Sequence, residues 1–120
     1  MATIRDKSDK VQDRIDKVES VTIESGQTES EGVNCLGTVL TGIQAPAVMT
    51  GTSFTFKVSD DGVTYIDYYN TAGNQLTTAV NAGKWTGIKP VDFAGVQWVK
   101  LVSSSAEAAQ REITLTMRGM

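Results

Sequence analysis

From Val21 to the C-terminus, apolar residues recur at every second position in short runs that are separated by turn residues. The segments SFTFKVS (53–59) and REITLTMRG (111–119) show this alternation most clearly. Successive side chains of a β-strand point to opposite faces, so a period of two indicates strands with one apolar face. About eight such runs follow one another at spacings near a dozen residues, which predicts an all-β antiparallel sandwich, most plausibly jelly-roll-like.

Glycine and aspartate mark the turns between these runs. The DDG sequence at Asp60–Gly62 is a tight hairpin signal, and Gly37 and Gly42 interrupt the run 33–44 in the manner of bulges or bends. Residues 81–85 (NAGKW) are expected to turn the chain, and 104–110 (SSAEAAQ) to form a polar loop. The expected strands are 21–25, 33–44, 53–59, 63–69, 75–80, 96–104 and 111–119.

The first twenty residues have a different character. They contain five basic and five acidic side chains, and the apolar residues fall on one helical stripe made of Ile4, Val11, Ile15 and Val18. Opposite charges stand four residues apart, as in Asp13 and Lys17, and support a helix. We therefore predict an amphipathic helical arm over residues 1–20, followed by one β-sandwich domain over residues 21–120.

A helix with so narrow an apolar stripe is not stable alone in water, so the arm must pack against something. Its own β domain, a second copy and another protein all remain open. The heptad spacing and the balanced charges favour a partner, and Ile4, Val11, Ile15 and Val18 are the predicted partner-binding residues.

Composition narrows the function classes. The net charge of −3 comes without a basic stripe, which argues against direct binding of nucleic acid. The N-terminus lacks the apolar segment of a secretion signal, and no apolar run approaches the length that spans a bilayer. A soluble protein made in the cytoplasm is expected.

The chain has no histidine and a single cysteine, Cys35. Ser–His and Cys–His relays are therefore excluded, and a zinc site would lack its usual ligands. Cys35 lies in an expected strand, where a half-buried structural thiol is favoured over a reactive one. We predict no enzyme activity, no catalytic residues, no metal site and no cofactor.

Carboxylates and aromatic side chains keep two alternatives open. Asp60, Asp61, Asp67 and Asp92 would have to supply a glycosidase pair or calcium ligands, but Asp60 and Asp61 belong to a turn, where aspartate bonds the local backbone. Aromatic residues would serve either the core, an oligomer contact or a sugar-stacking surface, with Tyr65 and Tyr69 on one sheet face and Tyr68 on the other. The aromatic candidates are Tyr65, Tyr68, Tyr69, Trp85 and Trp98.

Four segments of the body carry a family resemblance: VTIESGQTES, GIQAPAVMTGTSFTFKVSDDGVTY, DFAGVQWVKLVSS and REITLTMRG. Over residues 21–120 the chain resembles head decoration, or cement, proteins of tailed bacteriophages that have the jelly-roll type. The most distinctive parts are Ser25–Thr28, Pro46–Phe56 and Ser59–Gly62. The arm at 1–20 departs from the family's usual beginning.

The resemblance implies a structural protein on the outside of a virion. Its partner would be the major capsid protein, whose lattice it would stabilise through contact area, and it would act as a homo-oligomer, a dimer or a trimer. No direct contact with nucleic acid or membrane is implied. A phage tail or neck fitting and a carbohydrate-binding sandwich module are the alternative functions.

Overall fold

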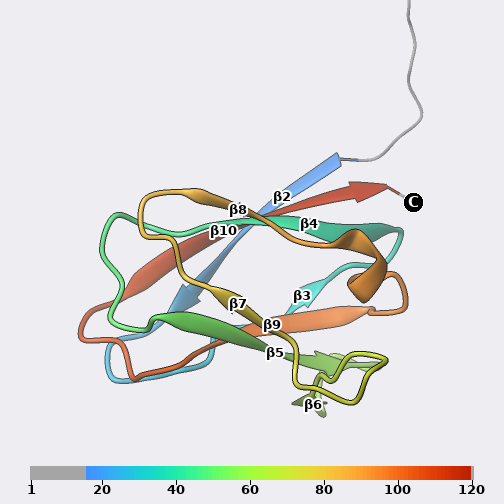
Figure 1. Ribbon diagram of the computed structural model, residues 1–120, viewed down its shortest axis with the longest axis horizontal. Helices are drawn as coiled ribbons and strands as arrows, with labels where there is room; N and C mark the ends of the chain where they lie inside the picture. Colours follow the sequence, from blue (N-terminus) through green and yellow to red (C-terminus); the bar gives the residue numbers. More distant parts are fainter. Residues whose placement is uncertain (1–15, 120) are drawn as a thin grey trace, which may run out of the picture.

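Two antiparallel sheets lie one above the other in the computed structural model, which describes residues 16–119 (Figure 1). Strands β9 and β10 and most of β5 alternate buried and accessible side chains as the sequence pattern predicts. The elements are β2 (Asp16–Ile23), β3 (Val33–Asn34), β4 (Thr38–Gln44), β5 (Ser53–Ser59), β6 (Ile66–Asp67), β7 (Thr77–Ala79), β8 (Trp85–Gly87), the 3₁₀ helix η1 (Pro90–Phe93), β9 (Trp98–Ser103) and β10 (Arg111–Gly119).

The strand order is that of a jelly roll. The first sheet runs β2-β10-β4-β8, and the second runs β3-β9-β5-β6, with β7 also paired to β5. Because β9 takes one edge of β5, both β6 and β7 lie along the other edge and act as one interrupted strand. In the first sheet, the first strand β2 pairs with the last strand β10. In the second sheet, the next strand β3 pairs with the next-to-last strand β9, as in a jelly roll made of two Greek keys. The predicted antiparallel sandwich is confirmed.

The core lies between the sheets and is built from the inward residues of each strand. In β10 these are Ile113, Leu115 and Met117, and the facing sheet contributes Phe54 and Phe56 of β5. Phe56 meets Phe93 of η1 edge to face at 5.0 Å, so the short helix closes one side of the core. The remaining buried apolar residues are Val21, Ile23, Val33, Cys35, Val39, Leu40, Ile43, Val99 and Leu101.

The regular runs were predicted best. Strands β5 and β10 have the predicted bounds, 53–59 and 111–119. Gly37 has φ of 80° at the turn before β4, and the register of β4 against β10 shifts next to Gly42, as the glycines indicated. The run 63–69 forms only the two-residue strand β6, and β8 and η1 were not predicted.

The helix predicted over residues 1–20 is wrong for Asp16–Ser20, which belong to strand β2. These residues continue the pairing of Val21–Ile23 with β10, and β2 runs without a break across the boundary predicted at Ser20. Asp16 contacts Arg118 across the strands at 3.1 Å in place of a helical partner. An eight-residue ladder outweighs the weak local preference of a charged segment for helix. Residues 1–15 lie outside the described residues.

Two truncations test this correction. Removing residues 1–20 deletes the pairing of Asp16–Ser20 with β10 and uncovers one side of Leu115 and Met117, whereas removing residues 1–15 leaves β2 whole. The shorter chain is expected to be less stable than the longer one by about 2 kcal/mol, the net value of a few strand hydrogen bonds. Chemical denaturation of the two proteins measures the difference, and equal free energies of unfolding would contradict the strand.

Candidate functional site

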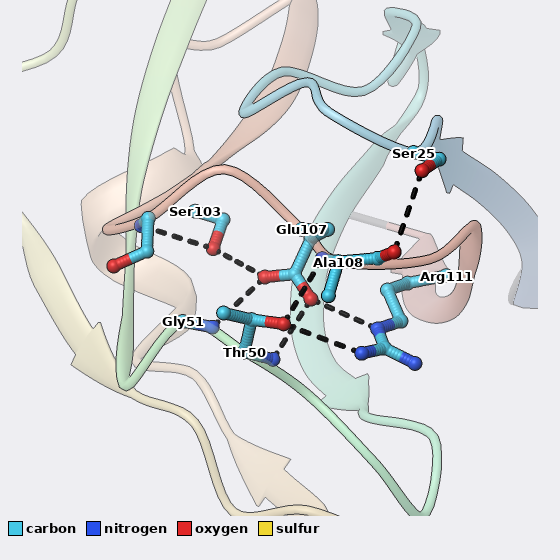
Figure 2. A network of polar contacts seen from close by, with 8 residues as sticks. Ser25, Thr50, Gly51, Ser103, Glu107, Ala108 and Arg111 are labelled. Atoms are coloured by element: carbon cyan, nitrogen blue, oxygen red, sulfur yellow. Dashed lines mark hydrogen bonds and ion pairs between the residues drawn. The ribbon is translucent and has the colours of Figure 1, made fainter.

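The most completely buried charged side chain of the described residues is Glu107, which is 1% exposed. It lies in the loop between β9 and β10 and accepts hydrogen bonds from four donors (Figure 2). The backbone N–H groups of Thr50 and Gly51 donate to it at 2.8 and 2.9 Å. The Ser103 hydroxyl donates at 2.7 Å and Arg111 Nε at 2.9 Å. We call these five residues the Glu107 network.

The backbone of Glu107 fastens a third segment. Its N–H donates to the Gln27 carbonyl at 3.0 Å, and its own carbonyl accepts from Gly26 N–H at 2.7 Å. Gly51 is required because a Cβ atom there would collide with the Ser103 hydroxyl. The loop 104–110 is thereby held against residues 26–27 and 50–51 at one end of the sandwich.

The electrostatics of the Glu107 network favour the ionised carboxylate. Burial opposes ionisation, but the hydrogen bonds from Thr50, Ser103, Arg111 and Gly51 outweigh it and lower the pKa of Glu107 to about 2. Both carboxylate oxygens are occupied by donors of the protein itself. The arrangement can therefore fasten loops, and it presents no oxygen to a ligand.

The acidic candidates of the sequence analysis have separate local contacts. Asp61 Oδ1 accepts the Ser59 hydroxyl at 2.8 Å and the N–H groups of Val63 and Thr64 at 2.8 and 2.9 Å, and these bonds lower its pKa to about 2. It thus organises the hairpin between β5 and β6, as the turn interpretation predicted. Asp67 pairs in register with Lys57, and Asp92 lies in η1. Among residues 16–119, no three His, Cys, Asp or Glu side chains cluster as metal ligands would.

Cys35 is buried at the end of β3, with its thiol 3.6 Å from the Met117 sulfur. Burial raises the pKa of this thiol to about 11, so it is protonated at neutral pH. The environment is that of the structural thiol predicted from the sequence.

The aromatic candidates divide between the core and the surface. Tyr68 leans on Phe93 with 5.6 Å between ring centroids, and its hydroxyl donates to the Asp92 carbonyl. Tyr65 lies beneath the Lys100 ammonium at 4.4 Å, and Trp98 packs over Gly62. Tyr69 and Trp85 are exposed. Neither of the ring pairs within residues 16–119 joins two of these five side chains.

Trp85 lies on the outer face of the first sheet. Its indole covers Gly42 of β4, where a Cβ atom would collide with the ring, and its Nε1 donates to the Thr116 hydroxyl of β10 at 3.3 Å. The ring is therefore held in place although it is 58% exposed. Thr116 pairs with Val18 of β2, which is 67% exposed. We call Val18, Thr114, Thr116 and Trp85 the Trp85 face.

On the outer side of the second sheet, Glu29 joins two strands. Its carboxylate contacts Lys57 of β5 at 2.7 Å and Lys100 of β9 at 3.2 Å. The hydrogen bond from Lys57, together with that from Lys100, lowers the pKa of Glu29 although burial acts in the opposite direction. All three charges are satisfied within the cluster, which favours a structural role.

Of the predicted partner-binding residues, Val18 alone lies within the described part of the chain, on the outer face of β2 and not on a helix. Ile4, Val11 and Ile15 lie outside it, and their role stays a prediction. The sequence did not single out Glu107. The SSAEAAQ segment reads as a polar loop, and the four-residue spacing from Glu107 to Arg111 was its only local signal.

Comparison with known proteins supports the fold. No family model matches the chain, and no curated protein matches it significantly. The crystal structure of the SPBc2 prophage-derived protein YomS is similar with a TM-score of 0.56 and 15% identity, over 92% of this chain and 100% of that one. A protein of Bacillus endospore appendages, which form disulfide-linked pili, aligns over 99% of this chain and 98% of that one with a TM-score of 0.44 and 10% identity. This β-sandwich thus also occurs in a prophage-derived protein.

Within residues 16–119 the structure contains no helix that is long and apolar enough to cross a membrane.

Replacing Glu107 with Gln is expected to lower the free energy of unfolding by about 3 kcal/mol, because the amide has one acceptor oxygen and turns its NH₂ group toward existing donors. The matched control is Glu112→Gln, which changes an exposed glutamate five residues further on. Urea denaturation of both variants measures the effect. Equal stability of the two variants would show that the Glu107 network does not hold the fold together.

The low pKa of Glu107 predicts acid sensitivity. The folded-state pKa of about 2 lies below the ordinary value of 4.5, so the stabilisation is complete above pH 4.5 and is lost as the pH falls towards 2. The loss at the acid end is about 3 kcal/mol. Unfolding free energies measured from pH 6 to pH 2 should fall more steeply for the natural protein than for Glu107→Gln. Parallel curves would contradict the prediction.

Proposed function

We propose that the chain is a structural protein of a tailed-phage particle, which binds the outside of the capsid and stabilises the lattice of the major capsid protein. The observation that carries the proposal is the similarity of the whole sandwich to the prophage-derived protein YomS, all of whose chain is covered. The resemblance of residues 21–120 to head decoration proteins points the same way. Both support the proposal of a phage-related structural protein.

The Trp85 face supplies a contact surface for such a role. An exposed tryptophan held by a hydrogen bond loses little side-chain entropy on binding, and tryptophan is among the commonest anchors of protein interfaces. The neighbouring side chains of Thr114, Thr116 and Val18 are short. A surface of this kind fits another protein better than a small molecule, which needs a concave pocket.

The Glu107 network suits a protein that acts by contact. It fastens loops from three parts of the chain at one end of the sandwich, so binding energy is not spent in ordering them. On a capsid, a modest contact repeats at every lattice position. Where one oligomer engages several positions, its contacts add through effective concentration.

Replacing Trp85 with Ala is expected to weaken capsid binding at least about tenfold, the effect of removing one interface anchor. The matched control is Val63→Ala, since Val63 is an even more exposed apolar side chain, in the loop between β5 and β6. Co-sedimentation of each purified variant with expanded capsids measures saturation and affinity. Hundreds of copies per particle indicate decoration, whereas about a dozen indicate the alternative of a tail or neck fitting.

Absence of binding by the natural protein would overturn the capsid proposal. The exposed indole of Trp85 also favours one alternative, a carbohydrate-binding module, because sugar rings stack on exposed aromatic faces. Quenching of tryptophan fluorescence by oligosaccharides, lost in Trp85→Ala, would support that function in its place.

A further inference from the structure

Strand β2 forms one edge of the first sheet, and the direction of its backbone groups follows from the ladder. In an antiparallel pair, the N–H and C=O groups of one residue point to the same side, and this side alternates along the strand. On β4, the Thr41 carbonyl and the Ala45 N–H form hydrogen bonds on the side of β8. The backbone groups of Gln44, one residue before Ala45, therefore point to the other side, towards Thr114 of β10. The even residues of β10 therefore face β4, and its odd residues face β2.

The even residues of β2 consequently turn their backbone groups away from β10. Thr22 confirms this independently, because its N–H points away from β10 and donates to the Glu31 carboxylate at 2.6 Å. Val18 and Ser20 share that direction and are exposed. Within residues 16–119, nothing bonds the outward backbone groups of these two residues. Among residues 16–119, the edge is therefore open beside Val18 and Ser20 and closed beside Thr22.

We propose that two copies of this protein pair through the open edges of β2, antiparallel and around a two-fold axis at Val18. Val18 then bonds to Val18 of the second copy through both backbone groups. The pairing joins two four-stranded sheets into one continuous sheet. A second copy is the partner that fits this edge, because Lys17 and Glu19 of β2 carry opposite charges and can pair with each other between two copies.

The charges select this register among those that the backbone allows. An axis at Val18 sets Lys17 opposite Glu19 of the second copy, twice, at positions where facing side chains come closest. An axis at Lys17 would set two lysines opposite each other, and one at Glu19 would set two glutamates opposite each other. An axis at Ser20 would require the N–H of Thr22, which Glu31 already occupies.

The inner and outer faces of the pair are also matched. Lys17 and Glu19 lie on the same side of β2 as the core residues Val21 and Ile23, but they are only half-buried. Val18 lies on the outer side, where its exposed side chain would cover that of the second copy. The two Trp85 faces would then form one strip across the joined sheet. The interface does not depend on a capsid, so it goes beyond the proposed function.

Charge exchange in the purified full-length protein tests the proposal. Lys17→Glu sets like charges opposite each other at both sites, and Glu19→Lys does the same, so each is expected to raise the dimer dissociation constant about tenfold or more. The double variant Lys17→Glu/Glu19→Lys restores opposite charges and is expected to dimerise within a few-fold of the natural protein. Sedimentation equilibrium over a range of concentrations measures all four proteins.

The controls separate pairing from folding. Lys89→Glu changes the net charge as Lys17→Glu does, at an exposed position beside η1, and should leave dimerisation unchanged. Lys17 also bonds the Asn34 carbonyl at 2.8 Å and Glu19 at 3.6 Å within one chain. The double variant loses the bond to Asn34 but regains an ion pair within one chain. The deciding rescue is therefore that of an equimolar mixture of Lys17→Glu and Glu19→Lys, which restores opposite charges between copies only.

Three results would overturn the proposal: a monomer at all concentrations, a trimer, or a dimer that the single charge exchanges leave unchanged. Amide hydrogen exchange identifies any other occupant of the edge. Protection of Val18 and Ser20 that rises with protein concentration supports the pairing. Protection of both amides in a monomer would mean that residues of the same chain cover the edge, and would also overturn it.

Discussion

The pairing of β10 between β2 and β4 determines both faces of the first sheet. Its register sends Ile113, Leu115 and Met117 into the core and leaves Thr114 and Thr116 outside. A shift by one residue would exchange these two sets, which would bury hydroxyls and expose the core. The outer position of Thr116, and with it the bond that holds the Trp85 indole, depends on the same register as the core.

The Glu107 network links that register to the second sheet. Ser103 is the last residue of β9 and Arg111 is the first residue of β10, so the carboxylate between them joins the end of one sheet to the start of the other. A buried ion pair contributes little when its partners lack further hydrogen bonds, but this one also receives two backbone N–H groups. It therefore defines how the chain crosses between the layers.

Alternation was sufficient to predict β5 and β10, because buried and accessible side chains alternate along most of each strand. It was not sufficient for residues 16–20, where charges at helical spacing outweighed a short alternation whose pairing partner, β10, lies at the other end of the chain. The burial of Glu107 could not be predicted from the sequence either, because two of its hydrogen-bond donors are backbone groups of the distant residues 50–51. A local sequence pattern shows which face of a strand is buried, but it does not show which distant residues that strand contacts.

The two edges of the first sheet are protected in different ways. Strand β8 has only three residues, and a short edge offers little to pair with. Strand β2 is eight residues long, and its accessible part carries Lys17 and Glu19. Charges on an edge strand repel or fail to match most foreign strands, so they suppress indiscriminate pairing. Because these two charges are opposite and flank Val18 symmetrically, the same side chains that exclude other strands favour a second copy of β2.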